Sequence, residues 1–300
     1  MRILSFEGGG VRGALSIHIL ARLIKRYPEL LTKTELYTGS STGSYIALCL
    51  ANNLPITTLK NLYSIKTAKY IFSSPRLNLL TPKYSNKHLV NILNKTFTPS
   101  LTLADLPNLV FIPAFNVHGY SKSHSNAVFL NNIIPNTTSH ETVVNTALYS
   151  SAFPAVFPSK NGFIDGTVIN NFPSISPILF LRSVYPHKYH ISDFRVLAIG
   201  TGLYPTTLKS NITNWGSIQW GLNPNKYMIS PLIDILLSAP LAVNDEYSKE
   251  LLGNNYFKIN PQLETLVKID SYKKIPLLIE VAKNLDLSTT YRYIETYYLK

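Results

Sequence analysis

The stretch ELYTGSSTGSYIALCLA, residues 35–51, holds the pattern that decides the fold. ELYTG is typical of a short strand, and the apolar run SYIALCLA is typical of a helix. The same order occurs earlier, where the strand RILSF (2–6) precedes the glycine loop EGGGVRG (7–13) and a helical pattern over 14–27. Strand, loop and helix twice in succession indicate a parallel sheet with helices on its faces.

The rest of the chain continues this alternation. We expect an α/β fold with three layers (α/β/α), a mainly parallel central sheet and a single domain over 1–300, with the motifs in about 1–202 and a helical part in about 229–300. Strands are expected at 108–117, 126–130, 194–200 and near 255–259; helices are expected within 56–98 and at 140–152, 229–250, 272–285 and 287–298; and a loop is expected at 203–228.

Composition and charge narrow the class of protein. The 28 Lys and Arg against 16 Asp and Glu give a net charge of +12, which favours contact with a polyanion or an anionic membrane, or reflects composition alone. The single cysteine, Cys49, allows no disulfide within the chain and suits a reducing compartment. No apolar run approaches the ~20 residues of a membrane-spanning helix. We expect a cytoplasmic or peripheral membrane protein, and secretion without a cleaved signal stays open.

One segment concentrates the positive charge. Residues 36–104 contain no Asp or Glu but seven Lys or Arg, from Lys60 to Lys95, with Tyr and Phe between them. Basic residues interleaved with aromatics suit an anionic membrane surface. An ordinary solvated helix face is the alternative.

The turn at residues 39–43 reads Gly-x-Ser-x-Gly. A serine hydroxyl becomes an effective nucleophile only when a base takes its proton and donors hold the resulting oxyanion. A sharp strand-to-helix turn exposes the serine, and flanking Gly39 and Gly43 relieve clashes. The pattern therefore makes Ser41 the candidate nucleophile.

The loop GGGVRG allows two interpretations. A dinucleotide-binding loop needs an acidic residue at the end of the next strand, but Glu35 lies at that strand's start. The other interpretation is an oxyanion hole in which backbone N–H groups of Gly9 and Gly10 converge. Arg12 then lies in the first turn of a helix, where Glu7, another carboxylate or a substrate phosphate would compensate its charge.

Asp165 lies in FIDGTVINN, residues 163–171. An Asp-Gly pair between apolar runs is a signal for a hairpin turn. Few other acids can serve as a base, because none of the sixteen lies between Glu35 and Asp105.

Together, EGGGVRG, GSSTG and DGT, in this order, resemble the patatin-like phospholipases, a family of lipid acyl hydrolases. NTALYSSAFPAVFP and VLAIGTG also look like the family's segments around its catalytic aspartate, so the resemblance covers about residues 1–202. It implies a Ser–Asp dyad in which Ser41 is the nucleophile and Asp165 is the base.

The resemblance further implies an oxyanion loop at Gly8, Gly9 and Gly10, with Arg12, Gly13, Gly39, Gly43 and Gly166 in support. It implies phospholipase A activity, the hydrolysis of carboxylic esters in phospholipids or lysophospholipids, without metal or cofactor. Two positions depart from the family's pattern: Glu7 replaces the usual Asp, and Thr167 replaces Gly or Ala after Asp-Gly. Thr167 is larger and puts the rate and the substrate size in question.

Other readings stay open. A Ser-Asp-His triad would use His187 or His190, since both follow Asp165 in the chain. A non-catalytic lipid-binding protein is a further alternative, and a nucleotide- or nucleic-acid-binding protein is a weaker one, because no nucleic acid is expected. An activating partner, the headgroup and the oligomeric state are not determined by the sequence.

Overall fold

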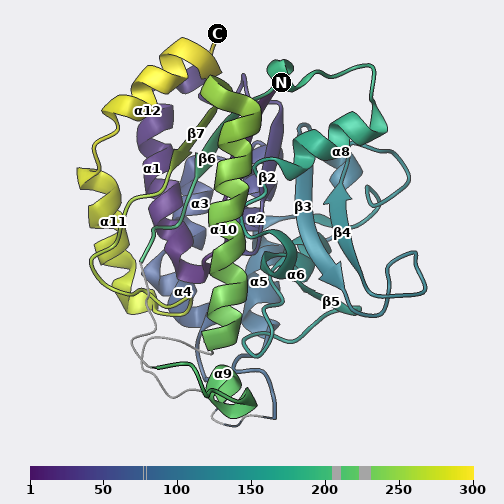
Figure 1. Cartoon of the computed structure of the whole chain (residues 1–300), viewed down its shortest axis with the longest axis vertical. Helices are drawn as coiled ribbons and strands as arrows, with labels where there is room; N and C mark the ends of the chain where they lie inside the picture. The colour runs from purple at the N-terminus through teal and green to yellow at the C-terminus, as the bar shows by residue number, and fades with distance from the viewer. Residues whose placement is uncertain (77, 79, 205–210, 223–230) are drawn as a thin grey trace.

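The computed structural model describes residues 1–76, 78, 80–204, 211–222 and 231–300. Within them lies one mixed sheet, shown in Figure 1, with strands β1 Arg2–Phe6, β2 Leu36–Gly39, β3 Leu109–Asn116, β4 Asn126–Asn131, β5 Phe163–Asp165, β6 Arg195–Ile199 and β7 Tyr256–Ile259. The strand order is β4-β3-β2-β1-β6-β7, and β5 also pairs with β3. All neighbours pair in parallel except β4 and β5, which run antiparallel to β3. The mainly parallel sheet is confirmed.

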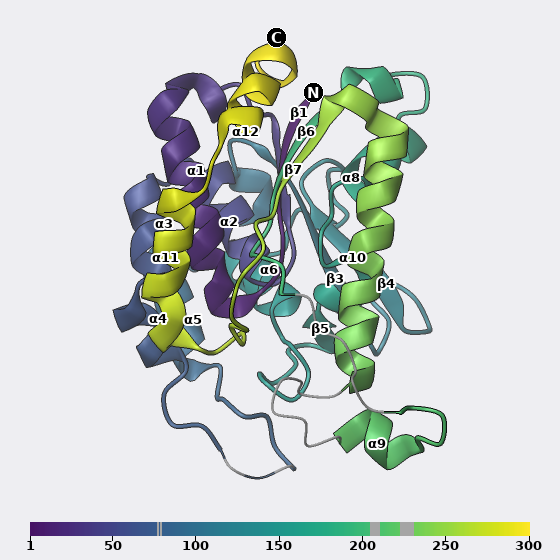
Figure 2. The same cartoon turned by 60° about the vertical axis from the view of Figure 1, so that its left-hand side comes forward.

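Helices cover both faces of this sheet. The helices of the described residues are α1 Gly13–Arg26, α2 Thr42–Ala51, α3 Ile56–Leu62, α4 Ile65–Ile71, α5 Lys87–Thr96, α6 Val143–Ser150, α7 Thr167–Asn170, α8 Ser176–Val184, α9 Ser217–Leu222, α10 Pro231–Leu252, α11 Ile275–Asn284 and α12 Ser288–Tyr293. Figure 2 shows the sheet nearly edge-on, with α1, α3, α4 and α11 on one side and α8 and α10 on the other. The three layers expected from the sequence are confirmed.

The strands alternate their side chains between two apolar cores. Leu4 and Phe6 of β1 are fully buried in the core that α1 and α2 cover, whereas Ile3 is buried in the core beside α8. This two-residue alternation lets one sheet bury both faces.

The C-terminal part joins the same sheet. Strand β7 pairs in parallel with β6, and α11 packs against α1. One expectation was wrong: the segment 203–228, expected to be a loop, contains α9 and a Trp215–Trp220 ring contact that its sequence pattern did not reveal. Residues 205–210 and 223–230, which include the expected start of the 229–250 helix, lie outside the described residues. No helix in the described ranges combines the length and the apolar character needed to cross a bilayer.

The turn between β2 and α2 is closed by two glycines. A Cβ on Gly39 would lie 2.3 Å from the carbonyl oxygen of Gly43, and one on Gly43 would lie 2.4 Å from that of Phe6. The first turn of α2 therefore rests directly on the ends of β1 and β2. Ser41, between the glycines, has φ 52° and ψ −122°, a conformation that L-residues rarely adopt.

We expect Gly43→Ala to lower the free energy of unfolding by about 1–3 kcal/mol, because the new methyl group meets rigid backbone. Urea unfolding of both proteins measures the change. Gly221→Ala is the matched control, since nothing lies within 4 Å of its added Cβ. Equal stability of parent and Gly43→Ala would contradict the close approach.

We expect Ser41→Gly to be more stable than Ser41→Ala by about 1 kcal/mol, because only glycine adopts a positive φ without strain. Both changes remove the hydroxyl, so the difference isolates the backbone. Thermal and urea unfolding under identical conditions measure it. If the alanine variant were as stable as the glycine variant, the turn would not be strained.

Candidate active site

Ser41 lies at the carboxyl end of β2 and caps α2, where it lines a cavity of about 300 Å³. Its backbone N–H donates to Ser150 Oγ at 3.2 Å, and Ser150 in turn donates to the carbonyl of Pro113 at 2.7 Å. The hydroxyl of Ser44 donates to the carbonyl of Ser41 at 2.6 Å. The turn is thus held by hydrogen bonds on both sides of Ser41.

Asp165 is the last residue of β5 and is completely buried. Its Oδ1 accepts the N–H of Thr167 at 2.8 Å, whereas its buried Oδ2 has no hydrogen-bond partner among the described residues. Burial raises the pKa of Asp165 to about 7, and the Thr167 N–H and the nearby Ser41 side chain act in the opposite direction. Asp165 is therefore a buried carboxyl group beside Ser41 with one oxygen unoccupied.

The glycine loop follows β1 and lines the same cavity as Ser41. The N–H of Gly8 is occupied, because Asn171 accepts it through its carbonyl at 3.2 Å and through Oδ1 at 3.1 Å. The N–H groups of Gly9 and Gly10 have no acceptor among the described residues. Gly10 has φ 58°, and a Cβ there would lie 2.2 Å from the carbonyl oxygen of Ile269. The loop thus offers two unoccupied donors, and Gly8 anchors it.

The buried Glu7 and the half-buried Arg12 are the charged groups behind this loop. Arg12 donates to the carbonyl of Gly202 at 3.1 Å and, weakly, to that of Gly9 at 3.4 Å. Burial raises the pKa of Glu7, and the positive charges of Arg12 and Lys258 oppose that rise. Glu7 is the negative neighbour expected for Arg12 from the sequence.

At the remaining predicted glycines, another part of the chain lies too close to leave room for a side chain. A Cβ on Gly166 would lie 2.0 Å from the carbonyl oxygen of Pro113, and one on Gly13 would lie 2.3 Å from the ring of Tyr63. With Gly39 and Gly43, they bring β5, α1 and α2 together around the cavity. The DGT segment forms no hairpin: β5 runs instead into α7.

The cavity beyond Ser41 is mainly apolar. One wall comes from the helices α3 to α5 and the segments near Phe153 and Val267, and the other wall comes from α10. The apolar side chains that line the cavity include Leu62, Ile71, Phe72, Leu89, Phe153, Val156, Phe157, Leu241, Val267 and Ile275. Tyr63, in the predicted basic segment, is buried and donates to the carbonyl of Thr42 at 2.5 Å. An elongated apolar group would be accommodated here.

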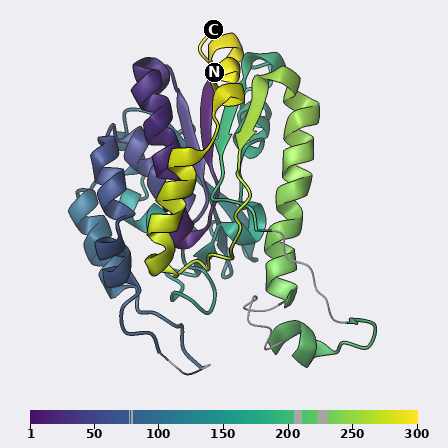
Figure 3. The same ribbon diagram turned by 90° about the vertical axis from the view of Figure 1, so that its left-hand side faces the viewer.

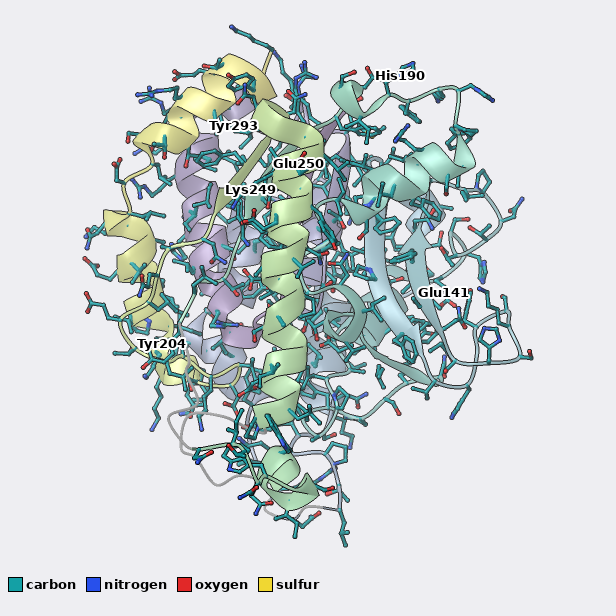
Figure 4. All side chains as sticks on the ribbon, in the orientation of Figure 1. Glu141, His190, Tyr204, Lys249, Glu250 and Tyr293 are labelled. Carbon is teal, nitrogen blue, oxygen red and sulfur yellow. The ribbon has the colours of Figure 1, made fainter. Side chains whose placement is uncertain are left out.

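The candidate histidines lie elsewhere. His187 and His190 are exposed, and Figure 4 places His190 at the end of the molecule that holds both termini, opposite the carboxyl ends of β1 and β2. No histidine donates to Asp165 in the described ranges. Glu35 accepts the N–H of Arg2 at the start of β2, away from the glycine loop. No cluster of three or more potential metal-ligating His, Cys, Asp or Glu side chains occurs among the described residues.

Some residues of the site were missed from the sequence. Asn171 fixes Gly8, Ser150 fixes Ser41, and Ile269 accepts the N–H of Val11 at 2.8 Å. Asn171 had a signal, since it belongs to the INN that follows DGT. Ile269 had none, because it lies about 260 residues from the loop it covers.

Comparisons with known proteins identify the family of the chain. The family model described as Patatin-like phospholipase matches residues 4–176. The chain is 28% identical to Protein teg of Priestia megaterium over 98% of each chain. It is 30% identical to a cGAMP-activated phospholipase of Pseudomonas aeruginosa over 86% of this chain and 77% of that protein. The chain belongs to the patatin-like phospholipase family.

Proposed function

We propose that the protein is a serine lipid acyl hydrolase that cleaves fatty acyl esters of phospholipids or lysophospholipids with a Ser41–Asp165 dyad. The observation that carries the proposal is the state of Asp165: it is buried beside Ser41, has one unoccupied oxygen, and has a pKa near 7. A carboxylate of that pKa is a far better base at neutral pH than an exposed aspartate.

The first half of the reaction is acyl transfer. Asp165 Oδ2 takes the proton of Ser41 as Oγ attacks the ester carbonyl carbon. The carbonyl electrons move to the oxygen, which the N–H groups of Gly9 and Gly10 hold. Collapse of this intermediate breaks the ester bond, and the departing alcohol takes the proton from Asp165. The acyl group remains on Ser41.

The second half is hydrolysis. Asp165 accepts a proton from water, which attacks the acyl-enzyme; collapse returns the proton to Ser41 Oγ and releases the fatty acid. The apolar cavity supports an acyl chain as the group bound beside Ser41. The similarity to a cGAMP-activated phospholipase supports the same substrate class. It does not indicate the headgroup or the position of cleavage.

The proposal is tested by fatty acid release from mixed phospholipid vesicles. We expect Ser41→Ala and Asp165→Asn each to reduce the rate by about 10⁴-fold, the scale seen when a nucleophile or its partner is removed. The His187→Ala, His190→Ala double variant should keep most of the activity, and its loss would support a triad. Equal release by parent, Ser41→Ala and Asp165→Asn would reject the proposal. Failure of a fluorophosphonate to label Ser41 would indicate a non-catalytic lipid-binding protein.

We also expect kcat/KM to rise with pH through an apparent pKa of about 7, because only the unprotonated carboxylate of Asp165 can accept the proton of Ser41. A pH–rate profile on a soluble ester measures this limb. Glu7→Gln is the control, since burial also raises the pKa of Glu7. Disappearance of the limb in Glu7→Gln would assign it to Glu7 and contradict the role of Asp165.

A further inference from the structure

Two projections continue from elements that line the cavity. One is formed by the described residues 72–76, 78 and 80–86 between α4 and α5, and the other is the segment 211–222 that includes α9. Figure 3 shows both extending from the end of the molecule opposite the two termini. Ile71 and Phe72 of the first wall and Asp234 and Ser238 of α10 line the cavity, so each projection continues one of its walls.

The described part of the first projection presents one apolar side chain fully to solvent. Leu80 is 96% exposed. Hydrogen bonds fix the backbone at this position, because Asn78 Oδ1 accepts the N–H groups of Leu80 and Thr81 at 3.1 and 2.9 Å. The N–H of Lys83 donates to the carbonyl of Ala155 at 2.8 Å, which ties the loop's base to the cavity wall. Exposure of a leucine side chain to water is unfavourable, and its transfer into an apolar phase is therefore favourable.

The second projection is uncharged and aromatic. Residues 211–222 contain no Asp, Glu, Lys or Arg. Ile218 is 72% exposed, and Trp215 and Trp220 stack edge to face with ring centroids 5.2 Å apart. Half-exposed tryptophans beside an exposed isoleucine are typical of residues at a lipid–water interface.

Positive charge surrounds the first projection. Lys69 in the last turn of α4, Arg76 in the loop and Lys87 at the start of α5 are exposed, and none has a carboxylate partner within 4.0 Å in the described part of the chain. Lys83 is different, because it pairs with Asp270 at 2.5 Å. Cations around an apolar tip complement phosphate headgroups above hydrocarbon.

We infer that Leu80, Ile218 and the cations Lys69, Arg76 and Lys87 form a surface that docks on an anionic phospholipid bilayer, with Leu80 and Ile218 entering the acyl layer. We name this surface the docking face. The inference relies on the proposed function for the identity of the substrate, whereas binding of the docking face to a bilayer does not depend on it. Docking there brings the elements that line the cavity against the bilayer, so a lipid ester reaches Ser41 without crossing open water.

The test measures vesicle binding without hydrolysis, using the full chain with Ser41→Ala. Flotation with vesicles of phosphatidylglycerol and phosphatidylcholine should show binding that weakens with salt and with loss of the anionic lipid. Lys69→Gln, Arg76→Gln and Lys87→Gln together should weaken binding about 100-fold, at about fivefold for each charge. Leu80→Ser with Ile218→Ser should weaken it at least about tenfold.

Matched controls separate the docking face from net charge and general hydrophobicity. The control set, Lys25→Gln, Lys95→Gln and Lys283→Gln, removes the same total charge. These lysines are exposed in the last turns of α1, α5 and α11. Leu179→Ser removes a side chain 48% exposed on α8. Both controls should bind within about twofold of the parent. Equal losses in test and control sets, or binding unaffected by the test sets, would overturn the inference.

The parent background keeps the two proposals apart. With Ser41 present, the docking-face variants should hydrolyse a soluble short-chain ester at the parental rate while losing activity on vesicles, because none of the changed residues lines the cavity. A protein that hydrolyses no ester but still binds vesicles through these residues would reject the proposed function alone. A protein that hydrolyses soluble ester but binds no anionic vesicle would reject the docking face alone.

Discussion

The contact between α2 and the ends of β1 and β2 is the constraint on which the rest of the structure depends. It exists because Gly39 and Gly43 have no side chains, so the backbone of α2 can touch the carbonyl of Phe6. That contact forces the chain through a positive φ at Ser41. This strained turn holds the Ser41 hydroxyl in the lining of an apolar cavity instead of within the helix.

Two buried acids near this turn have different surroundings. Burial raises the pKa of Glu7 while the charges of Arg12 and Lys258 oppose that rise, and its Oε2 accepts from Asn260 at 2.9 Å behind the glycine loop. No cation of the described residues acts on Asp165, and burial dominates its pKa. Because the folded pKa of about 7 exceeds the ordinary 3.8, the stability that Asp165 contributes is fully present below about pH 4 and is lost as the pH rises through about 7. The active state of the base is thus the less stable one.

The sequence was enough to predict what depends on neighbours in the chain. Both strand–loop–helix units were predictable, because each is encoded within about 25 residues by apolar period and glycine position. Ser41 and the glycine loop were identified as candidates for the same reason, whereas Asp165 was assigned as the base only through the resemblance to the patatin-like phospholipases. What the sequence did not reveal depends on long-range contact: the bond from Gly8 to Asn171 spans 163 residues, and the cover that Ile269 places over Gly10 spans more. The helix α9 was missed because its six residues carry no readable period.

The role of Thr167 depends both on the local sequence pattern and on contacts with residues distant in the chain. From the sequence alone, a threonine in place of Gly or Ala could only be read as a narrowing of the space beside the dyad. In the structure its N–H binds Asp165 Oδ1, and its methyl group faces Gly8, 2.7 Å from where a Cβ there would stand. The Thr167 side chain acts with this N–H to lower the pKa of Asp165 against the effect of burial, so a smaller residue would remove one of the groups that favour the carboxylate. The side chain that departs from the family's pattern therefore bears on the basicity of Asp165 as much as on the size of the substrate.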